Sequence, residues 1–125
     1  MKNTVTSIAE ATFERLGISY KKLPCRKGEF FYCKSPTGDA TFNLKYDENG
    51  IIRLWRFVAT APISKAGKHC VYRKPDYPYA KIGIEVTDEG DVCFFAEQAI
   101  DINDPQKIFR IDKMISGYIN LIADC

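Results

Sequence analysis

Apolar residues recur every three or four positions at both ends of the chain, and this spacing predicts a helix at each end. The first helix is expected over residues 4–16. The second follows Asp104 and Pro105, a pair typical of a helix start, and runs to the C-terminus. Its apolar stripe consists of Ile108, Ile111, Ile115, Tyr118, Ile119 and Ile122. A helix with such a stripe must bury it against another layer of the fold.

Between the two helices, apolar and polar residues alternate with a period of two, which is typical of half-buried strands. The alternation predicts strands over residues 18–23, 29–33, 41–46, 51–59, 81–86 and 92–97. The turns between them are short, so neighbouring strands must run antiparallel. Residues 1–125 therefore indicate a single α+β domain. We expect a mostly antiparallel sheet of about six strands, with the N-terminal and C-terminal helices packed on one face.

Two of the expected hairpins follow the same pattern at an offset of forty residues. In residues 42–50 and 82–90 the apolar positions coincide, and each turn ends on a glycine, Gly50 or Gly90. One explanation is a structural repeat of two hairpins in one sheet. The other is that any two hairpins share alternation and a turn glycine.

Residues 60–79 break the alternation and contain three of the six prolines. Apolar residues recur here at helical spacing, which fits a short middle helix over residues 63–73. Gly67 in its interior argues against that helix, because glycine has low helix propensity.

The cysteines give little support for a metal site. They are Cys25, Cys33, Cys70, Cys93 and Cys125. Their number is odd, no two have the Cys-x-x-Cys spacing of zinc sites, and His69 is the only histidine. We expect no metal, no cofactor and no catalytic residue. Without a signal-peptide pattern or a long apolar run, we expect a cytoplasmic protein with reduced thiols and no membrane partner.

The net charge of +2, from 18 basic and 16 acidic residues, hides a segregated chain. Residues 21–34 and 65–81 each carry five cations against one acid, whereas residues 85–125 carry nine acids against three cations. In the second basic segment tyrosines lie among the cations, a composition that can bind single-stranded nucleic acid or another anionic ligand. The candidate residues there are Lys65, Lys68, Tyr72, Arg73 and Lys74. The alternative is a solvated loop, since no nucleic-acid-binding motif is present.

Residues 77–92, with the sequence YPYAKIGIEVTDEGDV, resemble the middle of the bacterial YbjN family of sensory transduction regulators, whose members look like type III secretion chaperones in fold. The positions that match the family pattern are Pro78, Tyr79, Ala80, Lys81, Ile82, Ile84, Asp88, Gly90, Asp91 and Val92. The order of elements along the chain also fits. The sequence departs from the family at residues 60–79, where the family has a solid helix. The resemblance implies a small non-enzymatic binding domain, often dimeric, with no catalytic residue to carry over.

The sequence therefore predicts a protein-interaction module, chaperone-like or regulatory, that forms a homodimer and binds an unknown protein partner. Tyr46, Trp55 and Phe57 are candidate contact residues, because aromatic residues dominate interface energies, but they could equally belong to the core. One alternative is binding of nucleic acid or an anionic ligand through residues 65–81. A second is a small thiol-dependent enzyme or redox sensor that uses Cys25 or Cys33.

Overall fold

The computed structural model describes residues 4–123, which form two helices, seven strands and one short 3₁₀ turn. The first half comprises α1 (Thr4–Leu16), β1 (Ser19–Leu23), β2 (Glu29–Lys34), β3 (Thr41–Tyr46) and β4 (Ile51–Thr60). The second half comprises η1 (Ile63–Lys65), β5 (His69–Lys74), β6 (Tyr77–Val86), β7 (Asp91–Ala99) and α2 (Lys107–Ala123). Neither helix of this described part is long and apolar enough to cross a membrane.

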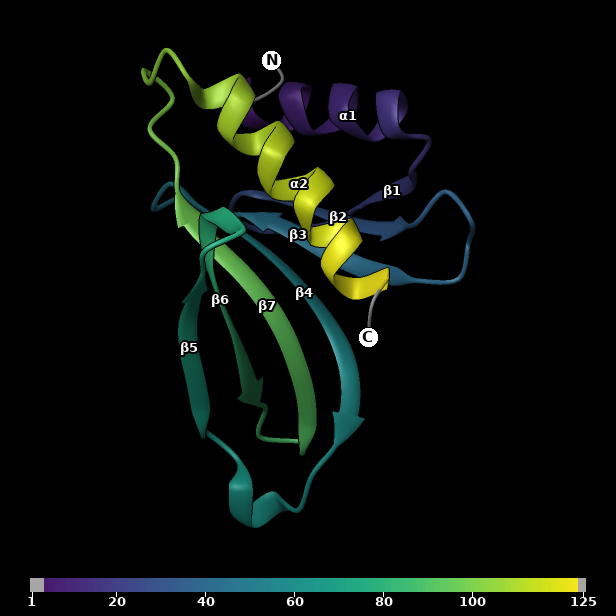
Figure 1. Ribbon diagram of the computed structural model, residues 1–125, viewed down its shortest axis with the longest axis vertical. Coiled ribbons are helices and arrows are strands. Elements are labelled where there is room, and N and C mark those ends of the chain that lie inside the picture. Colours follow the sequence, from purple (N-terminus) through teal and green to yellow (C-terminus); the bar gives the residue numbers. More distant parts are fainter. Residues whose placement is uncertain (1–3, 124–125) are drawn as a thin grey trace.

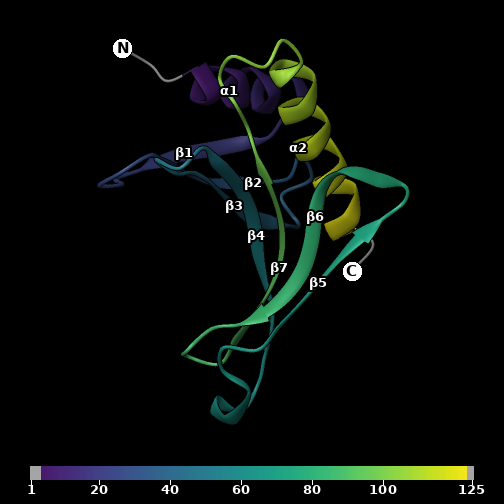
Figure 2. The same ribbon diagram turned by 90° about the vertical axis from the view of Figure 1, so that its left-hand side faces the viewer.

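All seven strands belong to one antiparallel sheet, in the order β1-β2-β3-β4-β7-β6-β5. Strands β1 to β4 and strands β5 to β7 form two meanders, which join along β4 and β7. Both helices lie on the same face of the sheet, and the far ends of β4, β7, β6 and β5 extend beyond them (Figures 1 and 2). The α+β class, the antiparallel sheet and the two terminal helices are confirmed, but the sheet has seven strands instead of about six.

The short middle helix that the spacing of residues 63–73 allowed does not form, and the objection raised by Gly67 holds. Only residues 63–65 form a single 3₁₀ turn, and β5 follows, paired antiparallel with β6. Gly67 separates the two with a positive φ of 80°, a backbone conformation that ends a helical turn. The β6 strand also begins at Tyr77, four residues before its predicted start, and its edge gains backbone hydrogen-bonding partners from β5. Pairing across the sheet therefore overrides the weak helical spacing.

The two hairpins that share a sequence pattern also share a turn geometry. The N–H of Gly50 donates to the Asp47 carbonyl at 3.2 Å, and the N–H of Gly90 donates to the Thr87 carbonyl at 2.9 Å. Both glycines have positive φ, 80° and 85°. The side chains of Asp47 and Thr87 each accept a hydrogen bond from the backbone N–H four residues further on. The two hairpins lie in one sheet, with β4 beside β7.

The main core lies between the helices and the sheet. Helix α2 contributes Ile111, Met114, Ile115, Tyr118 and Ile122, and α1 contributes Val5, Ala9 and Phe13. Two members of the predicted stripe are not fully buried: Ile119 is partly buried, and Ile108 is 63% exposed.

Ile108 differs most from the expectation. It lies in the first turn of α2 beside Ile8 and Ala11 of α1, so it does not reach the sheet.

Two tyrosine side chains attach α2 to the sheet. The buried hydroxyl of Tyr77 on β6 donates to the Met114 carbonyl at 2.6 Å, and that of Tyr118 donates to the Phe94 carbonyl at 2.7 Å. The Tyr118 ring also stacks on the Phe94 ring, with centroids 5.5 Å apart. Gly117 makes room for Tyr77, because a Cβ at position 117 would lie 2.4 Å from the Tyr77 ring.

We expect Gly117→Ala to destabilise the protein by about 2 kcal/mol, because the added methyl overpacks against Tyr77. In an unobstructed helix the same change would stabilise by ~1 kcal/mol, so the sign of the effect is diagnostic. Urea unfolding followed by circular dichroism measures it. The matched control is Ser116→Ala at the neighbouring position, which should leave stability unchanged or slightly higher. A stabilising Gly117→Ala would contradict the packing described here.

Candidate functional site

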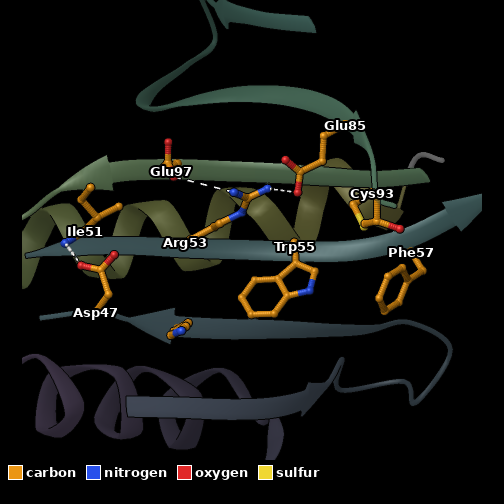
Figure 3. A pocket seen from close by; sticks show the side chains of 10 residues that line it. Asp47, Ile51, Arg53, Trp55, Phe57, Glu85, Cys93 and Glu97 are labelled. Atoms are coloured by element: carbon orange, nitrogen blue, oxygen red, sulfur yellow. Dashed lines mark hydrogen bonds and ion pairs between the residues drawn. The ribbon is translucent and has the colours of Figure 1, made fainter. Parts of the chain in front are cut away.

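The face of the sheet opposite the helices is open. On β4, Ile52 and Leu54 are buried on the helix side, whereas Arg53, Trp55 and Phe57 alternate with them on the other side. Figure 3 shows these three side chains along β4, with α2 behind the strands. We call this surface the open face.

The strand register aligns open-face side chains into rows that cross the sheet. One row is charged and contains Lys45, Arg53, Glu97 and Lys81. A second is mainly aromatic and contains Tyr32, Asn43, Trp55, Phe95, Gly83 and Val71. A third contains Phe57, Cys93, Glu85 and His69.

Arg53 is the electrostatic centre of the open face. Its guanidinium forms an ion pair with Glu85 and a longer one, 3.9 Å, with Glu97 (Figure 3). Lys81 also pairs with Glu97, Nζ to Oε2, at 3.3 Å. The Arg53 guanidinium lies 4.4 Å from the centroid of the Phe95 ring, within range of a cation–π interaction. The two glutamates are thus already neutralised by cations of the same face.

Phe95 and Cys93 are buried although they belong to the open face, so this face has a thin apolar layer of its own. Gly83 makes the layer possible: a Cβ there would lie 2.8 Å from the Phe95 ring. Beside it, the Trp55 ring meets the Phe30 ring edge-on, with centroids 5.4 Å apart. Between the rows runs a shallow groove of about 370 Å³, lined by Ile51, Arg53, Trp55, Phe57 and Cys93 among others.

The three predicted contact residues do not lie on one surface. Trp55 and Phe57 are both on the open face, where Phe57 is 55% exposed. Tyr46 is buried on the helix side, where it pairs across the sheet with Ile52, so its assignment to a contact surface is wrong and the core alternative holds. Burial, reinforced by the nearby charges of Asp47 and Asp101, raises the pKa of the Tyr46 hydroxyl.

The basic segment is also divided by the fold. Lys65 ends the η1 turn and Lys68 lies between that turn and β5, whereas Tyr72, Arg73 and Lys74 lie on the edge strand β5. Tyr72 pairs with Ile82, whose side chain faces the helix side, so Tyr72 points away from the open face. Lys74 Nζ lies 2.7 Å from the Asp76 carboxylate, and this hydrogen bond holds the pKa of Asp76 below its usual value. The five candidates therefore do not form one continuous binding surface.

Several open-face residues were missed by sequence reasoning, among them Arg53, Tyr32, Asn43, Lys45 and Phe95. Alternation along β4 was a sufficient signal for Arg53, because it lies two residues from Trp55. For the others the signal is absent from the sequence, because the pairing register decides which strands bring them together.

The buried thiols are poorly placed for catalysis. Cys33 is completely buried, and burial raises the pKa of its thiol to about 12, which disfavours it as a reactive group. Burial, with the nearby Glu85 carboxylate, also raises the pKa of Cys93. Cys25 is half-buried, and its Sγ lies 3.1 Å from the Lys27 carbonyl. Within residues 4–123 there is no group of three histidine, cysteine or acidic side chains that could hold a metal ion.

Comparison with protein-family models, with curated proteins and with solved structures finds no match to this chain. The resemblance of residues 77–92 to the YbjN family therefore stays a prediction.

We expect the cysteines of the native protein to react with iodoacetamide at very different rates. Among the four cysteines that the structure describes, Cys70 is exposed and should be alkylated first, followed by Cys25, whereas the buried Cys33 and Cys93 should stay protected. Peptide mass spectrometry after a brief pulse resolves each site, and a pulse in urea gives the unprotected reference. Rapid labelling of Cys33 in the folded protein would revive the thiol-enzyme alternative.

Proposed function

We propose that this chain is a non-enzymatic binding module, chaperone-like or regulatory, and that its ligand lies against the open face. The supporting observation is the placement of both helices on one side of the sheet, which leaves Tyr32 and Phe57 exposed and Trp55 half-buried on the other. Exposed aromatic side chains of this kind contribute disproportionately to binding energy.

The chemistry of the groove supports a binding role more than a catalytic one. The charged side chains at its centre form ion pairs with one another, since Arg53 pairs with Glu85 and Glu97. Its thiol, Cys93, is buried and has a raised pKa, so it is a poor nucleophile. Nucleophilic catalysis needs an accessible nucleophile beside a free base, and the described lining of the groove does not offer this pair.

We also propose that the protein forms a homodimer, as the family resemblance implies, and that it does so through the helix layer. Ile108 and Phe109 are exposed in the first turn of α2 and line one shallow apolar patch of the helix layer, and Ile102 is exposed in the segment that precedes the helix. Burying such a patch between two copies would leave the open face of each copy free for its ligand.

Multi-angle light scattering tests the homodimer. The molar mass measured for the wild type at high micromolar concentration should be twice that of one chain. Phe109→Glu should reduce the measured molar mass to that of a single chain, because it places a charge in the apolar patch. Phe57→Glu on the open face is the matched control and should stay dimeric. A wild type that is monomeric at this concentration would exclude the homodimer.

A comparative capture experiment tests the open face as the protein-binding surface. The wild type and two variants, Phe57→Asp and Tyr72→Asp, are immobilised and exposed to a cell extract under identical conditions. Both substituted rings are exposed, but only Phe57 lies on the open face. We expect proteins that bind the wild type and the Tyr72 variant but not the Phe57 variant. Equal loss with both variants, or with neither, would argue against the open face.

A further inference from the structure

The outward positions of β1, β2 and β3 carry lysines and no acid; the nearest acid of the groove is Asp47, which follows β3 and whose carboxylate accepts hydrogen bonds from the Asn49 and Ile51 N–H groups. The nine outward positions include Lys21, Lys34 and Lys45, and the others are Ser19, Leu23, Phe30, Tyr32, Thr41 and Asn43. None of the three lysines forms an ion pair with an acid of the described chain. The paired glutamates of the face, Glu85 and Glu97, lie on β6 and β7 instead. This half of the surface therefore favours an anionic ligand.

Aromatic rings lie among these lysines. Tyr32 is 38% exposed, faces Lys21 across the β1–β2 pair and is two residues from Lys34 on the same strand. Trp55 lies two strands away in the same row, beyond Asn43. The Tyr32 and Trp55 backbones are thus roughly 10 Å apart, and Phe57 follows Trp55 by about 6.6 Å along β4. Exposed Tyr32 and half-buried Trp55, which packs edge-on against Phe30, therefore lie among the lysines over a shallow surface.

We propose that this half of the open face binds single-stranded nucleic acid, with bases stacked on Tyr32 and Trp55 and phosphates beside Lys21, Lys34 and Lys45. The inference rests on the open face being the binding surface, as proposed above. Every base has a flat π-face, and unpaired bases stack readily on exposed aromatic side chains, whereas the bases of a duplex are not available for this. Asn43, between the two rings, can hydrogen-bond a base edge.

Two other occupants fit less well. A second copy docked by a two-fold axis on this half would place the same three lysines against each other, and like charges at an interface are unfavourable. An acidic protein segment would satisfy the lysines but would not need exposed rings at spaced positions. It is the main competing outcome of the test.

Trp55 is the only tryptophan of the chain, so its fluorescence reports directly on the proposed site. We expect short oligo(dT) and oligo(U) to quench it saturably in the full-length protein, and a duplex of matched length to do so far less. Three phosphate contacts on a single strand predict that log K falls with log salt with a slope of about −2. The same titrations are repeated with polyglutamate as the anionic protein probe.

Matched variants locate the site. Tyr32→Ala should weaken oligo(dT) binding roughly tenfold, since stacking on one ring is lost. Lys34→Ala should make the salt slope shallower by about 0.7, since one phosphate contact is lost. The controls are Tyr72→Ala and Lys68→Ala, which remove an exposed tyrosine and an exposed lysine away from this half of the face and should leave both quantities unchanged. Thermal unfolding of each variant verifies that the fold is intact.

The outcomes separate the two proposals. Quenching by polyglutamate but not by oligonucleotides overturns the nucleic-acid inference and leaves the open face standing as a protein-binding surface. Oligonucleotide binding that is lost in Tyr72→Ala and Lys68→Ala, but not in Tyr32→Ala, moves the site to residues 65–81 and overturns the inference. No response to an oligonucleotide at low salt, by fluorescence or by anisotropy of a labelled strand, also overturns it.

Discussion

The attachment of α2 to the sheet is the constraint on which the rest of the structure depends. Tyr77 and Tyr118 are almost completely buried. The hydroxyl of Tyr77 donates a hydrogen bond to the Met114 carbonyl, and that of Tyr118 donates one to the Phe94 carbonyl. A buried hydroxyl without a partner costs free energy, so these bonds determine where the helix can lie as well as holding it there. With α2 and α1 on the same side, one face of the sheet is committed to the core and the other stays open.

The open face differs from the core because its aromatic side chains lie close to water. On the β4, β6 and β7 side the Arg53 guanidinium covers Phe95, and Arg53 and Lys81 neutralise Glu85 and Glu97. On the β1 to β3 side the outward strand positions carry three lysines and no acid, and Asp47, the acid nearest to Lys45, accepts hydrogen bonds from the backbone of its own turn. The result is an electrostatic asymmetry within one surface: the charges of one region are paired with each other, whereas the lysines of the neighbouring region form no ion pair in the described chain. A net charge of +2 gives no indication of this division.

How far the site could be predicted is clearest for the three aromatic candidates. Trp55 and Phe57 lie two residues apart on a strand, so alternation places them on the same face whatever the fold. Tyr46 belongs to another strand with its own alternation, and only the pairing of Tyr46 with Ile52 shows that it faces the helices. Similarly, Tyr72, Arg73 and Lys74 are adjacent in sequence, but consecutive residues of a strand point to opposite faces. A basic segment therefore does not become a basic surface.

The sequence alone determined the elements whose signals are local: the two amphipathic helices, the alternating strands, and hairpin turns that need a glycine with positive φ at Gly50 and Gly90. Tertiary structure decided what depends on partners distant in the chain. The edge of β6 required a neighbour for its backbone groups, and residues 69–74 became a strand although their spacing favoured a helix. Strand register then selected which side chains share the open face. A period-two pattern gives the alternation within a strand, but only pairing between strands brings Tyr32, Trp55 and their lysines onto one surface.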